Sequence, residues 1–313
     1  MPLPFITADE VRQRVPMLSA VDAIEQTLRD GLDPAGAPAR SSVPLAPGSF
    51  LLMPAQPRGS AGVKVASVAP DNPAAGLPKI QGLYLLFNAT TLEPSAVLEG
   101  SSLTEIRTPA LSAVGVRHLA PGRGRTGDGV DVVLFGTGPQ AYNHVHATAA
   151  VRPINSVTVL GRRQSKVDEL VARLTQDGVS AVAGTDPADH VPQADLVLCC
   201  TSAREPLFDG SLVRDDALVV AMGSHEPDAR ETDDVLLSRA TVYVEDVDTA
   251  MREAGDVRIA VDNTTISTDD LHTLSELVND GPVEAPGPVL LKTVGMGWQD
   301  LAVAEVAYST EER

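Results

Sequence analysis

Short apolar runs, separated by helical or polar stretches, recur along the chain after residue 129. In order, the runs read DVVLFG, SVTVLG, AVAG, DLVLCC, ALVVAMG and TVYVED. Short runs that are rich in valine and leucine favour buried strands, and strands that alternate with helices favour a parallel sheet with crossover connections. The second part of the chain is therefore predicted to be a doubly wound α/β domain.

The first 120 residues follow a different pattern, with more proline and shorter alternation. Two amphipathic patterns in residues 7–32 predict helices, and Thr7 with Glu10 has the spacing of a capping box. Prolines recur from Pro34 to Pro57, where we expect short extended pieces. The segments GVKVASVAP, GLYLLFNA and PSAVLEG predict strands, the last two as a hairpin around TTLEP. We therefore predict an α+β domain here.

Two longer helices are also predicted. The segment 101–120 reads SSLTEIRTPALSAVGVRHLA, in which Ser102 and Glu105 again have capping-box spacing. Pro109 does not suit a helix interior and fits better at a first helical position after Thr108, so the start of this helix stays open. The final segment, GWQDLAVAEVAYSTEER, predicts an amphipathic helix with a frayed polar end.

A glycine-rich, basic segment at residues 121–129 marks the expected domain boundary. Because the apolar runs that favour a parallel sheet all follow this segment, we predict a first domain over residues 1–120. The second predicted domain, over residues 121–297, is a Rossmann-type dinucleotide-binding domain.

The composition is that of an ordinary soluble enzyme, with 43% hydrophobic and 21% charged residues. A formal net charge of −18 argues against nucleic acid and anionic membrane as partners. No apolar run is long enough to span a membrane, and the N-terminus lacks the pattern of a signal peptide. Cys199 and Cys200 are neighbours in an apolar run and point to opposite faces of a strand, so we expect buried, unpaired thiols and a cytoplasmic protein.

The first apolar run ends in a turn that is typical of dinucleotide binding. After the strand come Gly136, Thr137, Gly138, Gln140 and Ala141, and a helical pattern follows. Glycine lets the backbone approach a pyrophosphate, and the helix N-terminus supplies N–H groups and the positive end of a dipole. A glycine-rich turn without a ligand is the alternative interpretation.

The end of the second apolar run indicates which nucleotide is bound. NAD sites usually place an acidic residue about twenty positions after the glycine turn, but this chain has Arg162 and Arg163 there, and its next acid is Asp168. Guanidinium groups suit the 2′-phosphate of NADP(H). NADP(H) is therefore the preferred cofactor in this prediction, and NAD(H) is the second choice. The alternative is that both arginines are solvated residues at the start of a helix.

Several segments together resemble the ornithine cyclodeaminase/mu-crystallin family. They read RTPALSAVGVRHLA, GTGPQAYNHVHA, GSHEPDARETDDVLLSRATVYVED and KTVGMGWQDLAVAE, and the resemblance covers about residues 5–310. It implies a homodimer in which residues 1–120, joined by a C-terminal helix at 298–313, bind substrate and form the dimer. It also implies hydride exchange at the carbon that bears an amino-acid nitrogen.

The resemblance assigns roles to individual residues. Arg40 and Arg107 match arginines that bind the substrate carboxylate, and Lys64 matches an active-site lysine. An imino acid needs a charge-assisted anchor, which arginine provides, and a lysine whose pKa is lowered can act as acid or base. Positions beside the cofactor are matched by Thr108, Met222, Gly223 and Ser224. We also expect Thr201, after the run DLVLCC, to contact the cofactor.

One residue departs from the family pattern. Cyclodeaminases and alanine dehydrogenases of the family resemble each other in an aspartate soon after the strand that corresponds to ALVVAMG, where this chain has His225. Because histidine can act as acid or base near neutral pH, His225 is a second candidate for the catalytic group. A loop histidine that forms a polar wall is the alternative. The change disfavours ornithine cyclisation and fits ketimine reductases, which lack the aspartate.

We therefore predict an NADP(H)-dependent imine or ketimine reductase that acts on an α-imino acid. One alternative is a cyclodeaminase of the ornithine or lysine type, or an amino-acid dehydrogenase, that uses NAD. The other is a catalytically weak NADPH-binding protein. No cluster of Cys, His and carboxylate residues suggests a metal, and no G-x-S-x-G motif suggests a hydrolase.

Overall fold

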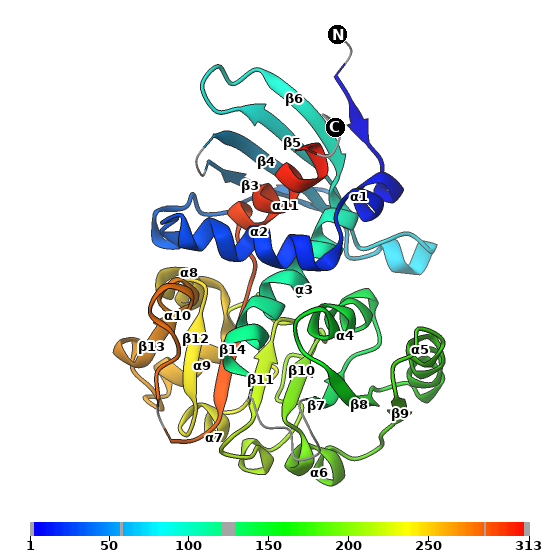
Figure 1. Ribbon diagram of the computed structural model, residues 1–313, viewed down its shortest axis with the longest axis vertical. Coiled ribbons are helices and arrows are strands. Elements are labelled where there is room, and N and C mark those ends of the chain that lie inside the picture. The colour runs from blue at the N-terminus through cyan, green and yellow to red at the C-terminus, as the bar shows by residue number, and fades with distance from the viewer. Residues whose placement is uncertain (1–2, 57–58, 121–128, 285, 310–313) are drawn as a thin grey trace. The chain divides into compact units, whose positions relative to one another are not determined.

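A computed structural model describes residues 3–56, 59–120, 129–284 and 286–309 (Figure 1). The chain divides into two compact units, one of residues 1–111 with 295–313 and one of residues 112–294. The division falls inside a long helix, α3 (Gly100–Leu119). The glycine-rich segment that we expected at the boundary lies, apart from its last residue, outside the described residues.

The first unit contains a six-stranded sheet with the strand order β1-β6-β5-β4-β3-β2. β1 runs parallel to β6, and the other neighbouring strands are antiparallel. The strands are β1 (Phe5–Ile6), β2 (Ser41–Leu45), β3 (Gly48–Ala55), β4 (Ser60–Val68), β5 (Ile80–Asn88) and β6 (Pro94–Glu99). The expected hairpin of β5 and β6 is therefore confirmed.

This unit also contains the first part of α3 and the helices α1 (Ala8–Arg14), α2 (Met17–Arg29) and α11 (Gly297–Ser309). The capping box of Thr7 and Glu10 begins α1, as its spacing predicted. The prediction of an amphipathic C-terminal helix is wrong, because residues 297–304 of α11 are all buried. α11 contacts α2 as well as β3, β4 and β5, so it is a core helix with no wide solvent-facing side in its first half.

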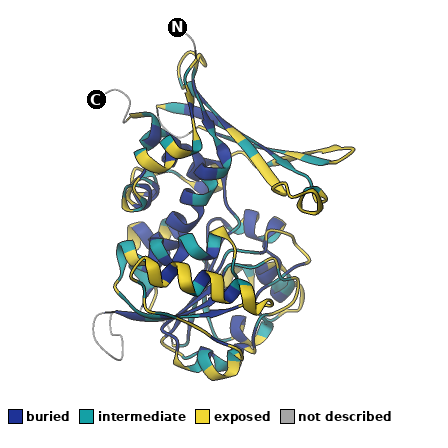
Figure 2. Ribbon diagram, turned by 90° about the vertical axis from the view of Figure 1, so that its right-hand side faces the viewer, coloured by how far each residue is buried: buried dark blue, intermediate teal, exposed yellow. Residues whose placement is uncertain are grey.

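Along the strands of the sheet in the first unit, buried residues alternate with more exposed ones (Figure 2). Met53, Lys64, Tyr84 and Leu98 are cross-strand neighbours, and all four are buried. Residues of opposite parity along the strands point to the other face, since side chains alternate. That face exposes large apolar side chains, among them Phe5, Val43, Leu45, Phe50 and Leu83.

The second unit contains an eight-stranded parallel sheet with the order β13-β12-β14-β11-β10-β7-β8-β9. Its strands are β7 (Val130–Phe135), β8 (Ile154–Leu160), β9 (Ala181–Ala183), β10 (Leu196–Cys199), β11 (Leu218–Ala221), β12 (Thr241–Val244), β13 (Leu271–Thr273) and β14 (Val289–Lys292). From β7 the chain adds β8 and β9 on one side, and β10 and β11 lie on the other. This reversal of strand order is the place where open α/β sheets bind nucleotides.

Helices connect the parallel strands. They are α4 (Pro139–Val151), α5 (Gln164–Gln176), α6 (Pro187–His190), α7 (Asp234–Leu237), α8 (Val247–Glu253), α9 (Gly255–Asp262) and α10 (Leu274–Asp280). Short 3-10 helices occur at η1 (Pro34–Gly36), η2 (Asn72–Ala75), η3 (Val191–Gln193), η4 (Gly210–Leu212) and η5 (Thr268–Asp270). All residues of β10 and β11 are buried, as expected for strands that are covered on both faces.

The predicted strands of this unit are confirmed but incomplete, and one prediction for α3, whose N-terminus belongs to the first unit, is wrong. The apolar runs form β7 to β12, whereas β13 and β14 were not predicted. The capping box of Ser102 and Glu105 is wrong, because α3 begins at Gly100 and keeps Pro109 inside it. Instead, the Glu99 carboxylate accepts hydrogen bonds from the backbone N–H groups of Ser101 and Ser102, at 3.0 and 2.7 Å. A carboxylate there also suits the positive end of the helix dipole.

Candidate functional site

A cavity of about 860 Å³ lies beside the carboxyl ends of β7, β8 and β10 in the second unit. It is lined by Phe135, Gly136, Thr137, Gly138, Pro139, Gln140, Leu160, Gly161, Arg162, Arg163, Lys166, Glu169, Thr185, Pro187, Cys200, Thr201, Ser202, Ala203 and Leu207. The cavity therefore brings together the glycine turn, both predicted arginines and Thr201. Cys200 is half-buried here, not fully buried as expected, while Cys199 is buried.

The glycine turn has the backbone that close approach to a phosphate requires. Gly136 has φ of +116°, and a side chain there would meet the carbonyl oxygen of Cys200. Gly138 precedes the first residue of α4, and a Cβ at Gly138 would point into open space. The N-cap residue, Gly138, has no side chain that could cap this helix. The N-terminus of α4 is thus suited to a pyrophosphate, which fits a dinucleotide.

The cationic end of the cavity contains one group that the sequence prediction missed. Arg162 and Arg163 are exposed and lie directly after β8. Lys166, from the first turn of α5, also lines the cavity and contacts Glu169 at 2.5 Å. The sequence could have indicated Lys166, because this residue lies one helical turn beyond the arginines. Glu169 offsets part of this positive charge.

The segment after β11 carries the other predicted cofactor residues. Met222 and Gly223 are half-buried and Ser224 is buried, whereas His225 is exposed. None of these residues lines the cavity at the glycine turn. Thr201 is tied to the segment after β11 through a shared partner, because both Thr201 and Gly223 donate backbone hydrogen bonds to Glu231.

A second cluster, in the first unit, contains the residues expected to bind substrate. Lys64 on β4 and Arg107 on α3 are only 5% and 6% exposed, and Arg40 lies before β2. Lys64 Nζ lies 3.1 Å from Asp300 Oδ1, and Arg107 Nε lies 3.4 Å from the same oxygen. Arg107 Nη1 donates to Gln299 Oε1 at 3.1 Å, and Arg40 Nη2 donates to the carbonyl oxygen of Gly295 at 2.7 Å. The prediction brought these cations together but missed all three partners.

The electrostatics of this cluster favour an anion. Lys64 and Arg107 share the buried carboxylate of Asp300, and the charge of Arg40 also acts on Lys64, so positive charge is in excess. The pKa of Lys64 is lowered to about 8, because burial and the charges of Arg107 and Arg40 lower it by more than the charge of Asp300 raises it. Lys64 can therefore gain or lose a proton near neutral pH.

Two neighbouring side chains are polar and buried. The side chain of Thr108 has no hydrogen-bond partner for Oγ1 among the described residues. Tyr84 lies opposite Lys64 on β5, and burial, with the nearby carboxylates of Asp300 and Glu305, raises the pKa of its phenol. Tyr84 therefore stays neutral and does not add to the charge of the cluster.

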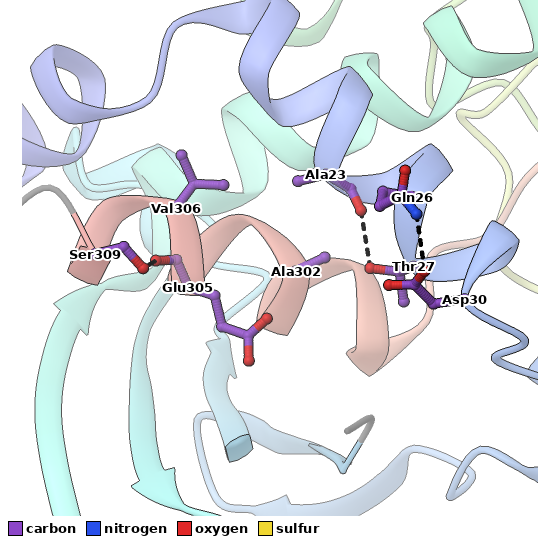
Figure 3. A pocket seen from close by; sticks show the side chains of 8 residues that line it. All are labelled: Ala23, Gln26, Thr27, Asp30, Ala302, Glu305, Val306 and Ser309. Carbon is purple, nitrogen blue, oxygen red and sulfur yellow. Dashed lines mark hydrogen bonds between the residues drawn. The ribbon is translucent and has the colours of Figure 1, made fainter. Parts of the chain in front are cut away.

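A separate groove of about 480 Å³ lies between α2 and α11 (Figure 3). It is lined by Ala23, Gln26, Thr27, Asp30, Ala302, Glu305, Val306 and Ser309. Gln26, Thr27 and Ser309 bond within their own helices, as Thr27 Oγ1 does with the carbonyl oxygen of Ala23 at 2.8 Å. Since none of its lining residues is cationic, the groove does not suit a carboxylate substrate.

Two further findings apply to the part of the chain that the structure describes. None of its helices is both long and apolar enough to cross a membrane. No group of three or more His, Cys, Asp or Glu side chains within it is placed to hold a metal ion.

The chain is similar to known proteins along nearly its whole length. A family model described as the ornithine cyclodeaminase/mu-crystallin family matches residues 4–312. Delta(1)-pyrroline-2-carboxylate reductase 2 of Burkholderia ambifaria is 34% identical over 274 residues, which cover 86% of this chain and 83% of the relative. This match and the family model confirm the resemblance that the sequence motifs suggested.

Solved structures share the fold. An archaeal alanine dehydrogenase dimer with bound NAD is 26% identical, with a TM-score of 0.90 over 100% of this chain and 97% of that one. The Thermococcus litoralis Delta(1)-pyrroline-2-carboxylate reductase, in complex with NADH and L-proline, has a TM-score of 0.90 at 24% identity and covers 99% of this chain and 98% of that one. The predicted fold class, a Rossmann-type sheet with a second α+β domain, is confirmed.

Proposed function

The chain belongs to the ornithine cyclodeaminase/mu-crystallin family, and from this premise we propose that it is an NADP(H)-preferring imine reductase that acts on an α-imino acid. Its relatives are named reductases and dehydrogenases of imino and amino acids. The chain is accordingly an oxidoreductase that uses a nicotinamide cofactor. The proposal extends this to the substrate class, the cofactor preference and the residues that act.

The observation that carries the proposal is the buried pair of Lys64 and Arg107 on the carboxylate of Asp300, with the half-buried Arg40 bonded to Gly295 of the same unit. A substrate carboxylate needs an anchor, and guanidinium groups form charge-assisted bonds with carboxylates. Reduction of a C=N bond also needs a proton at the nitrogen. Lys64 supplies a positive charge near the substrate carboxylate. Its ammonium group, with a pKa of about 8, supplies the proton.

The proposed chemistry follows from these groups. A bound reduced nicotinamide supplies a hydride to the imine carbon. As the carbon–hydrogen bond forms, the π electrons of the C=N bond move to the nitrogen, which takes a proton from Lys64. Arg40 and Arg107 hold the carboxylate and thereby orient the imine beside Lys64. The lysine is left neutral and is reprotonated before the next turnover.

The preference for NADP(H) rests on the cations at the end of β8. Arg162, Arg163 and Lys166 line the same cavity as the glycine turn, and no acid occupies the position that usually binds the ribose hydroxyls of NAD. Two exposed guanidiniums suit a phosphate. Related structures contain NAD or NADH, so the preference is a property that we propose for this chain specifically.

We further propose that the protein is a homodimer formed through the exposed sheet face of the first unit. Phe5, Val43, Leu45, Phe50 and Leu83 are exposed on that face. A contiguous apolar surface on a sheet is typical of a protein–protein interface. The alanine dehydrogenase with the same fold is a dimer.

A turnover assay separates this function from its alternatives. Five- and six-membered cyclic α-imino acids are offered with NADPH and with NADH, and a cyclic imine without a carboxylate serves as control. We expect reduction of the imino acids with NADPH and little reduction of the control. Ammonia release from ornithine or lysine would point to a cyclodeaminase instead, and tight NADPH binding without turnover on any substrate would point to a binding protein.

A further inference from the structure

Three charged side chains that the proposed chemistry does not use lie buried in the second unit. Glu231 and Asp256 are 0% exposed, and Lys292 is 1% exposed. They lie where β10, β11 and β14, adjacent strands of the parallel sheet, reach their carboxyl ends. Burial of ionised groups costs free energy unless each is paired and hydrogen-bonded, so their contacts indicate what they do.

Glu231 joins the segments that follow two neighbouring strands. Its Oε1 accepts hydrogen bonds from Thr201 N at 2.8 Å and from Thr201 Oγ1 at 2.7 Å. Its Oε2 accepts one from Gly223 N at 2.7 Å. Thr201 comes two residues after β10 and Gly223 two residues after β11. One carboxylate therefore fixes the separation of these two segments.

Asp256 and Lys292 hold this carboxylate in place from behind. Asp256 Oδ1 accepts from the backbone N–H groups of Glu231 and Thr232, each at 2.8 Å. Lys292 Nζ lies 3.0 Å from Asp256 Oδ2 and donates to the carbonyl oxygen of Ser224 at 2.6 Å. Burial and the charge of Asp256 raise the pKa of Glu231 above its usual value, and the charge of Lys292 and the hydrogen bonds from Thr201 limit this rise. Lys292 thus favours the ionised form, which accepts bonds at both oxygens.

The packing at Gly223 shows how closely the two segments approach. A Cβ added to Gly223 would meet the carbonyl oxygen of Thr201 and Oε1 of Glu231. The backbones after β10 and β11 therefore lie close together, and the Glu231 carboxylate is bonded to both of them. Because its two oxygens are bonded to both segments, a displacement of this carboxylate would strain or break these hydrogen bonds.

We propose that Glu231, supported by Asp256 and Lys292, is a positioning residue that fixes the surface on which the nicotinamide ring lies. This inference rests on the proposed function, because its premise is that the nicotinamide ring lies beside Thr201 and Met222–Ser224. The three residues touch neither the ring nor the substrate. They act by holding the backbone after β10 and β11, so that the ring keeps the distance and angle that hydride transfer needs.

The variant Glu231→Gln tests this role with little change in shape. An amide has one acceptor oxygen, and its NH₂ group cannot accept from a backbone N–H. One of the two segments therefore loses its hydrogen bond. We expect kcat to fall about 10- to 100-fold and the primary deuterium isotope effect of 4-deuterated NADPH to rise as hydride transfer becomes slower. The dissociation constant of NADPH should stay within about threefold, since the phosphates are bound at the glycine turn.

Asp195→Asn provides a matched control. Asp195 is 0% exposed and precedes β10, at the opposite end of the same strand. It accepts from Asp131 N at 2.9 Å and pairs with Arg214 at 3.1 Å. This variant should lose a few degrees of melting temperature and keep the wild-type isotope effect. A wild-type isotope effect in Glu231→Gln, or an equal rise in Asp195→Asn, would overturn the proposal.

A second variant and a second readout keep the test decisive. Thr201→Val removes only the hydroxyl bond to Glu231 and one to Ala203 N, and should raise the isotope effect by a smaller amount. If Glu231→Gln does not fold, an unchanged isotope effect in Thr201→Val overturns the proposal. If the wild-type protein reduces no imine, the proposed function fails, and the fluorescence anisotropy and lifetime of bound NADPH then decide. Glu231→Gln should lower both, and wild-type values would overturn the positioning role.

Discussion

At the scale of single residues, Lys64 is the group on which the proposed mechanism depends. Lys64→Met should lower kcat about 10²–10⁴-fold, the usual worth of a proton-transfer group, while NADPH binding stays nearly unchanged. Lys79→Met, an exposed lysine of the same unit, is the control and should keep wild-type rates. Steady-state kinetics measure both. If His225→Ala is the slow variant and Lys64→Met remains active, His225 is the proton donor instead.

The pKa of Lys64 predicts how the rates of imine reduction and of the reverse oxidation depend on pH. Because this pKa is lowered to about 8, the ammonium form is present below pH 8 and is lost above it. Reduction needs the ammonium, so its kcat/KM should fall above about pH 8, whereas oxidation should rise there. Asp300 raises the pKa of Lys64, so in Asp300→Asn the decline should begin at lower pH. A decline that begins at the same pH in both proteins would show that another group controls it.

Arg162 and Arg163 carry the prediction of cofactor choice. Each charge-assisted contact to a 2′-phosphate should contribute about 1.5–3 kcal/mol. Arg162→Ala and Arg163→Ala should therefore weaken NADPH binding roughly tenfold or more and leave NADH binding unchanged, which makes NADH the internal control. Fluorescence titration measures both dissociation constants. Equal constants for the two cofactors in the wild-type protein would contradict the prediction.

At the scale of elements, the N-terminus of α3 matters because this helix carries Arg107 and Thr108. Glu99 caps it through the N–H groups of Ser101 and Ser102. Glu99→Ala should therefore lower the free energy of unfolding by about 1 kcal/mol, a typical value for the loss of a helix cap. Urea denaturation measures this change.

Glu105→Ala is the comparison for the cap. The sequence pattern had made Glu105 the partner of Ser102, but in the structure it pairs with the exposed Arg12 at 3.1 Å. An exposed ion pair contributes little to the free energy of unfolding, so this variant should change that free energy by less than about 0.5 kcal/mol. A larger loss for Glu105→Ala than for Glu99→Ala would favour the capping box that the sequence suggested.

At the scale of the whole molecule, the exposed sheet face of the first unit predicts assembly. Phe50→Glu places a charge on that face, where burial against a second copy would be costly, and should convert the dimer to a monomer. Val182→Glu is the control, because Val182 is 55% exposed in the second unit and lies outside the proposed interface. Light scattering gives the masses. A wild-type monomer at micromolar concentration would contradict the proposal.

The sequence by itself determined the features that depend on neighbours along the chain. The glycine turn at Gly136–Gln140, the strands β7 to β12 and the arginines after β8 were all predicted, because each is a local pattern of residue type and spacing. The strands β13 and β14 were missed although β9 to β12 are equally short, and β13, which reads LHT, has only one apolar residue. The family also followed from the sequence, through motifs that recur in a set order.

Only the tertiary structure decided which distant residues meet. Lys64 and Asp300 lie 236 positions apart, and Glu231 reaches Thr201 across 30 positions. The sequence shows that Asp300 lies in the apolar segment that forms α11. This indicates that its carboxylate has a partner but does not identify that partner. The partner is decided by strand register and by the packing of α11 against the sheet, which are contacts between segments remote in sequence. The burial that lowers the pKa of Lys64 arises from the same packing, so its chemistry was not readable from local pattern.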